Sequence, residues 1–126
     1  MSAKFQMINE LSQDILTAMV SNSQIATAYE STEEGHAAVM ITMSVRLSAL
    51  FYSVSVVALK DVDDSHAISS LASRLLCNMV RNHEIATVDD VGDAALATAM
   101  IQKSIGFAQA YFGNLPEILG QLEANQ

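Results

Sequence analysis

The sequence has few residues that turn or stop a chain. Pro116 is the only proline, and none of the five glycines stands in a Gly-Gly, Asn-Gly or Asp-Gly pair. Short hairpin turns depend on such pairs, so a sandwich or barrel of short strands is disfavoured. Tryptophan is absent, whereas alanine, leucine, methionine and glutamine are plentiful, a composition that leans toward helices. We therefore expect an all-α fold.

Cysteine and basic residues are also scarce. Cys77 is the lone cysteine, which excludes an intramolecular disulfide and favours a reducing compartment. Six basic residues stand against 14 acidic ones, for a net charge of −8, and no two basic residues are adjacent. This balance disfavours nucleic acid or an anionic membrane as a direct partner and favours a basic one. The N-terminal segment lacks the apolar core of a signal peptide, so we expect a cytoplasmic protein.

The length of 126 residues suits a single domain spanning 1–126, and no repeat or linker divides it. Apolar residues at helical spacing predict four main helices. They cover about 3–20, 31–60, Asp61 or Asp63 to about 81, and 88–112. Gly113 is predicted to end the fourth, and Pro116 to begin a short last helix. Short connections favour an up-down bundle of these four helices plus the short C-terminal one.

The second predicted helix contains the most apolar stretch of the chain, residues 36–60. Ser31 and Glu34 have the spacing of a capping box, and no stop signal follows before residue 60. Alternating apolar residues over 39–47 are a rival strand pattern, but the run has no central turn and is too long for one strand. The run is also long enough to span a bilayer. Arg46 near its middle would cost roughly 2.5–3.5 kcal/mol there, which favours a soluble helix.

Two polar stripes on this helix suggest a central position in the bundle. Ser44, Ser48 and Ser55 fall on one side, where small side chains allow close approach of a neighbour. The roughly opposite stripe contains Thr42, Arg46, Ser53 and Lys60. The remaining apolar surface exceeds what three neighbouring helices readily cover, so we expect a homodimer. The candidate interface residues are Met40, Met43, Leu47, Phe51 and Tyr52.

Candidate reactive groups are few. Acidic residues and histidines gather near predicted helix ends, where they could bind a metal or simply be solvated: Glu33, His36, His83, Asp89 and Asp93. Arg74 and Arg81 flank Cys77 at helical spacing and could lower the pKa of its thiol, but no base or oriented partner accompanies it, so the favoured interpretation is an unreactive, partly buried or exposed cysteine. No motif for a serine hydrolase, phosphate-binding loop, zinc protease or CxxC site occurs.

These patterns predict a non-enzymatic protein without cofactor or metal that acts by binding another protein, as an inhibitor, adaptor or chaperone. The predicted partners are a second copy and another, basic protein, with no nucleic acid or membrane. The alternative is a small-ligand or metal-binding helical bundle that uses the acidic and histidine-rich helix ends.

Overall fold

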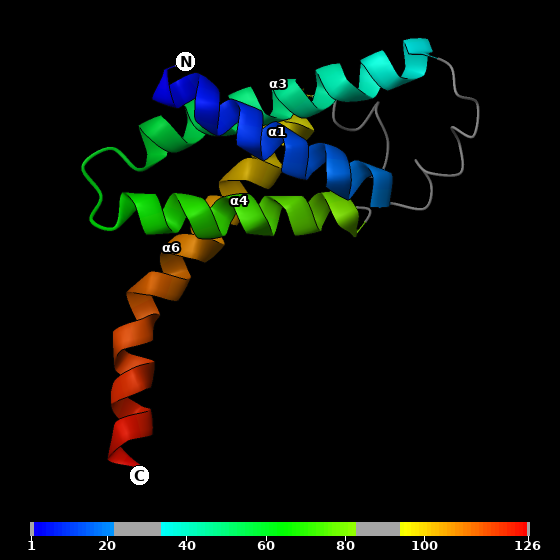
Figure 1. The fold of residues 1–126 in the computed structure, drawn as a ribbon. Coiled ribbons are helices and arrows are strands. Elements are labelled where there is room, and N and C mark those ends of the chain that lie inside the picture. Colours follow the sequence, from blue (N-terminus) through cyan, green and yellow to red (C-terminus); the bar gives the residue numbers. More distant parts are fainter. Residues whose placement is uncertain (1, 22–33, 83–93, 126) are drawn as a thin grey trace.

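The computed structural model describes residues 2–21, 34–82 and 94–125, with the backbone alone for 34–39 and 94. The four helices in this part of the chain are α1 (Ala3–Ser21), α3 (Glu34–Ala58), α4 (Ser65–Arg81) and α6 (Ala94–Ala124). Figure 1 shows their arrangement. The all-α prediction is confirmed, and the strand alternative for residues 39–47 is wrong, because that stretch lies inside α3.

The helices form a ring of four packed pairs: α1 with α3, α3 with α6, α6 with α4, and α4 with α1. Their directions alternate along the chain, since α1 and α4 run from left to right in Figure 1 and α3 from right to left. Consecutive helices α3 and α4 are not one of the principal pairs, so they lie diagonally across the bundle. The four-helix prediction is confirmed, and packing decides which helices are neighbours.

The core lies where the four helices face one another. Each contributes apolar side chains that are almost fully buried, including Ile15 of α1, Phe51 of α3, Leu76 of α4 and Ile101 of α6. Burying a large apolar side chain stabilises a fold by about 1.5–3 kcal/mol. This shared cluster accounts for the ring arrangement, because every helix presents one apolar face to it.

The serine stripe predicted to allow close packing does so. Ser44, Ser48 and Ser55 are all buried. The Ser48 hydroxyl donates a hydrogen bond to the backbone carbonyl of Ile8 on α1, with an oxygen–oxygen distance of 2.9 Å. Ser44 and Ser55 bond instead to carbonyls of their own helix, at 2.7 and 3.0 Å. The small serine side chains therefore let α1 and α3 approach closely while each buried hydroxyl keeps a partner.

The opposite stripe of the same helix faces solvent. Thr42, Arg46 and Ser53 of α3 are all exposed, and so is Lys60, which lies just beyond the end of the helix. The two stripes predicted from helical spacing are thus on opposite sides of α3 in the fold, one in the core and one in water.

The connection from α3 to α4 differs from the prediction. Neither Asp61 nor Asp63 caps α4; the N-cap is Asp64, and its side chain makes no capping hydrogen bond. Asp61 and Asp64 both have left-handed backbone conformations, with φ of 61° and 60°. Aspartate tolerates that region better than most residues, and both side chains are exposed. The aspartates here turn the chain, whereas the sequence pattern suggested that one would cap the helix.

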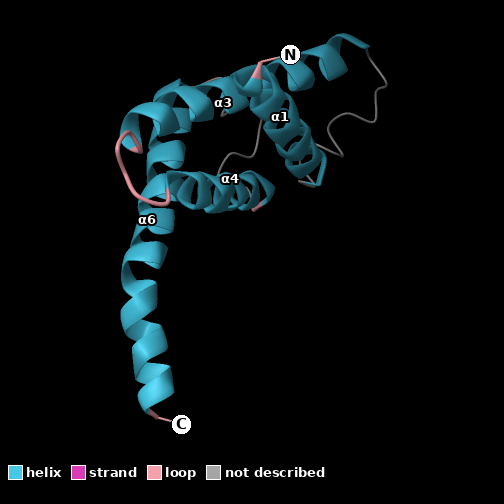
Figure 2. Cartoon of the chain, turned by 60° about the vertical axis from the view of Figure 1, so that its left-hand side comes forward, coloured by secondary structure: helices cyan, strands magenta, loops and turns pink. Residues whose placement is uncertain are grey.

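The C-terminal prediction also needs correction. Gly113 does not end the fourth helix and Pro116 does not begin a separate one, because α6 runs without a break to Ala124. Pro116 has no N–H to donate to the Phe112 carbonyl, a defect normally worth about 3 kcal/mol. The predicted start of this helix, residue 88, lies outside the described residues. Figures 1 and 2 show the last part of α6 standing clear of the other three helices.

Candidate interaction surfaces

The residues predicted to form an interface on the second helix lie mainly in the core. Met40, Leu47 and Phe51 are buried within this chain. A partner cannot reach these three side chains while the bundle stays closed, so they belong to the core and not to an exposed surface. Met43 is half-buried against the core, and Tyr52 is half-buried too. Helical spacing identified the apolar positions of α3 but not which of them its own chain would cover.

Tyr52 connects α3 to the beginning of α1. The Lys4 ammonium lies 5.6 Å from the centre of the Tyr52 ring and 5.8 Å from that of Phe5. At these distances a cation is attracted to the face of an aromatic ring. Phe5 is itself exposed. Tyr52 thus has a cationic partner within the chain, and only part of its ring remains available to another molecule.

A different set of apolar residues on α3 faces outward. Ile41, Val45 and Val56 are about half exposed, and half-buried Ala49 and Tyr52 fill the same helical stripe. The spacing of four, four, three and four residues keeps all five on one side of the helix. We call this set the α3 outer stripe. It is an apolar surface of α3 that the described residues leave partly exposed.

The segment Met40–Ala58 is long and apolar enough to cross a membrane, by length and composition alone. It is the one such helix in the described part of the chain, and a third of it is buried inside the fold. The core helix of a soluble protein passes the same test. The hydrogen bond from Ser48 to α1 and the exposed Arg46 near its middle fit a helix packed against protein.

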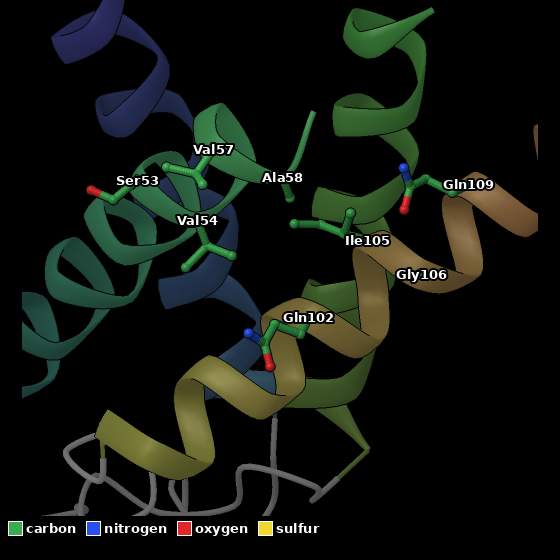
Figure 3. Close-up of a pocket in the computed structure, with 8 residues that line it drawn as sticks. All are labelled: Ser53, Val54, Val57, Ala58, Gln102, Ile105, Gly106 and Gln109. Atoms are coloured by element: carbon green, nitrogen blue, oxygen red, sulfur yellow. The ribbon is translucent and has the colours of Figure 1, made fainter. Parts of the chain in front are cut away.

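An apolar hollow separates the end of α3 from α6. Its volume is about 510 Å³, within the range of small-molecule sites. Figure 3 shows Val54, Val57 and Ala58 on one side and Ile105 and Gly106 on the other. The remaining lining residues are Ser53, Gln102 and Gln109, so no charged side chain contributes to it. A ligand here would be held by apolar contact and amide hydrogen bonds, without the acidic and histidine groups expected from the sequence.

The exposed end of α6 continues a stripe that begins in the core. Apolar residues recur at alternating intervals of four and three: Ile101, Ile105, Ala108, Phe112, Leu115, Leu119 and Leu122. Ile101 and Ile105 are 0% and 3% exposed, whereas Leu119 and Leu122 are 49% and 57% exposed. The stripe remains apolar along the whole helix, whereas its exposure to solvent increases toward the C-terminal end.

We call residues 109–124, beyond the last buried residue Ala108, the α6 arm. Tyr111 and Ile118 flank the stripe on one side and are half exposed. Sequence reasoning missed this arm because Gly113 and Pro116 suggested a break. The signal that could have found it is the seven-residue apolar repeat, which runs through both of these residues.

Cys77 is protonated in this fold at neutral pH. Burial raises the pKa of its thiol to about 11; the Asp14 carboxylate adds to the rise, and Arg81 opposes it. The alternative of a reactive thiolate beside two arginines is therefore not supported, and the raised pKa agrees with the favoured interpretation of an unreactive cysteine. Desolvation and an acidic residue from α1 outweigh the nearby positive charge. Neither the pairing with α1 nor this burial can be read from the spacing of residues on α4.

The acidic and histidine cluster falls mostly outside the described residues. This applies to Glu33, His83, Asp89 and Asp93, while His36 is placed in α3 by its backbone alone. Within the described ranges, no three histidine, cysteine or acidic side chains lie close enough together to hold a metal ion. The metal-binding alternative therefore has no support from the part of the chain that is described.

Comparison with protein-family models, with curated proteins and with solved structures found no match to this chain.

Proposed function

We propose that this protein acts, without catalysis, by binding another protein as an inhibitor, adaptor or chaperone, and that it does so in the cytoplasm as a homodimer. The observation that carries the proposal is the α3 outer stripe. Monomeric soluble proteins seldom expose a continuous apolar face of this kind unless it contacts something. The stripe is also built on a helix, a rigid element on which contact residues keep their spacing.

Charge supports a basic partner. The chain has a net charge of −8. The exposed carboxylates of Asp61, Asp63 and Asp64 stand together just beyond the C-terminal end of α3. An acidic rim beside an apolar stripe would raise the rate of association with a basic protein and disfavour acidic ones. The α3 outer stripe would supply contact area, and the aspartates would supply orientation.

A protein partner suits this surface better than a lipid bilayer. Insertion would have to separate α3 from α1 and leave the buried serines without the packing described above. Exposed Arg46 lies on the helix that would enter the bilayer, and no cluster of basic residues flanks it. Both features make insertion costly.

The test is a pull-down with tagged protein from extract of the native host, followed by binding measurements with the purified captured protein. Ile41→Gln with Val45→Gln should weaken that binding at least about 10-fold, because each buried apolar group is worth about 1.5–3 kcal/mol. Val20→Gln on α1, also half exposed, is the matched control and should bind like the unmodified chain. Unchanged affinity in the α3 double variant, with helicity retained, would remove the α3 outer stripe from the proposal.

A further inference from the structure

We infer that the α6 arm pairs with the α6 arm of a second copy of this chain, in an antiparallel, coiled-coil-like contact. The inference rests on the proposed homodimer and names the surface that forms it. It moves the dimer contact from the second helix, where the sequence pattern suggested it, to the C-terminal end of α6.

The first argument is that the arm needs a partner to be helical. It contains Gly113, Pro116 and Gly120, which are poor helix formers. Together they destabilise the helix by about 5 kcal/mol relative to alanine at the same three positions. An isolated helix of this length is marginal in water even with favourable residues. No residue of the arm is fully buried by the described part of its own chain. Phe112 packs against the core, but beyond it the described part of the chain offers the arm little contact, so pairing with a second helix would stabilise the arm.

The second argument is the period of the stripe. Spacing of four and three residues repeats every seven residues, which is the pattern that lets two helices keep one seam in contact. Within the bundle this seam is already used, since Ile101, Ile105 and Ala108 are buried there. Half-buried Phe112 and Leu115 continue the seam away from the core, and Leu119 and Leu122 carry it into solvent. A second helix carrying the same repeat is the natural complement.

The third argument is area. Tyr111, Ile118, Leu119 and Leu122 are about half exposed, which corresponds to roughly 100 Å² per side chain of this size. With smaller contributions from half-buried Phe112 and Leu115, the arm offers roughly 400–500 Å². A symmetric pair would bury about 1,000 Å², the lower limit for a specific interface. Because a second copy presents the identical surface, one two-fold contact covers both arms.

Charge favours the antiparallel orientation. The arm holds two acidic residues, Glu117 and Glu123, and no basic one. Six of the eight net negative charges therefore lie outside the arm. Antiparallel arms place the two acidic bundles at opposite ends of the contact, whereas parallel arms would bring them together. The absence of lysine and arginine from the arm also gives it nothing to attract an anionic membrane.

The accessible seam residues define a register. Pairing Leu115 with Leu119 of the second copy also places Phe112 beside Leu122, so that all four seam residues of each arm take part in the contact. The two-fold axis then passes near Glu117, which lies on the side of the helix away from the seam. Neither carboxylate of the arm is buried by this arrangement.

The first experiment measures mass by light scattering over a range of concentrations. The unmodified chain should have twice the mass of one chain. Leu119→Gln with Leu122→Gln should raise the dimer dissociation constant at least about 100-fold, since four leucines leave the contact. Phe107→Gln is the matched control: Phe107 is exposed on α6 but lies off the seam, and its replacement should leave the dimer intact. Circular dichroism checks that the bundle remains folded in each variant.

The second experiment tests orientation with cysteines, in a Cys77→Ser background. A mixture of the Phe112→Cys and Leu122→Cys proteins, whose positions are paired in this register, should form a disulfide between the two variants on oxidation. Neither protein alone should cross-link efficiently, because identical positions would be too far apart for a disulfide in an antiparallel pair. Efficient cross-linking of each variant with itself would indicate parallel arms and overturn the orientation.

The outcomes separate this inference from the proposed function. A dimer that survives the leucine double variant but dissociates on Ile41→Gln with Val45→Gln would overturn the arm contact and leave a homodimer in place. A strictly monomeric chain that still binds another protein would overturn both the arm pairing and the proposed homodimer, and would leave the proposed binding of another protein in place. A monomer that binds no protein would contradict both.

Discussion

Replacing Phe51 with alanine is the sharpest test of the fold. Phe51 is fully buried, with 0% of its surface exposed, and is the largest fully buried side chain among the described residues. Truncating such a residue removes its transfer free energy and leaves a cavity, at a combined cost of about 3–5 kcal/mol. For a chain of this length, 1 kcal/mol corresponds to a change in Tm of about 4 °C. We expect Phe51→Ala to lower Tm by about 12–20 °C.

The assay is urea and thermal unfolding followed by circular dichroism, at one fixed protein concentration because dimerisation also affects apparent stability. Val57→Ala is the control: Val57 is 78% exposed and on the same helix, so its replacement should change stability by less than about 0.5 kcal/mol. If Phe51→Ala abolished self-association but changed Tm by no more than the control does, Phe51 would be an interface residue after all. The core described for α3 would then be wrong.

Three further predictions address the packing, the turn and the thiol. Ser48→Ala should cost about 1 kcal/mol in urea unfolding, because it removes the hydrogen bond to the Ile8 carbonyl, and an unchanged midpoint would contradict the importance of that bond. Asp61→Ala should be less stable than Asp61→Gly by about 1 kcal/mol, since φ is 61° there, and equal stability of the two variants would mean that the turn relaxes. In the folded state the pKa of Cys77 is about 11, above its ordinary value of 9.0, so the folded protein holds the thiol proton more tightly and its stability should fall as pH rises from 9 to 11. The thiol of the folded protein should also react with a disulfide reagent at pH 8 more slowly than the thiol of the protein unfolded in urea. Equal rates would refute its burial.

Much of the fold follows from local patterns. The C-terminal ends of α1 and α4 lie within about one residue of the predicted limits, residues 20 and 81. Periodic apolar residues mark a helix wherever it packs. The serine stripe of α3 was also predictable, since helical spacing alone places Ser44, Ser48 and Ser55 on one side. What spacing does not reveal is the neighbour that this side meets.

The candidate surfaces were less predictable. Met40, Leu47 and Phe51 have the same apolar character as exposed Ile41 and Val56, so composition could not separate core from surface. The α6 arm was hidden by two local stop signals, although its apolar repeat continues through them. In both places the local pattern identified the apolar residues correctly but did not show which of them the rest of the chain covers.

The sequence by itself determines the helical class, the approximate helix limits and the faces on which apolar residues gather, because these depend on backbone preferences and on spacing within one helix. Only the tertiary structure decides that α3 and α4 lie diagonally, that Asp14 and burial raise the pKa of Cys77, and that α6 extends past its neighbours. These depend on which faces of different helices meet. That choice is made by the summed packing of many side chains distant in sequence, and no single segment encodes it.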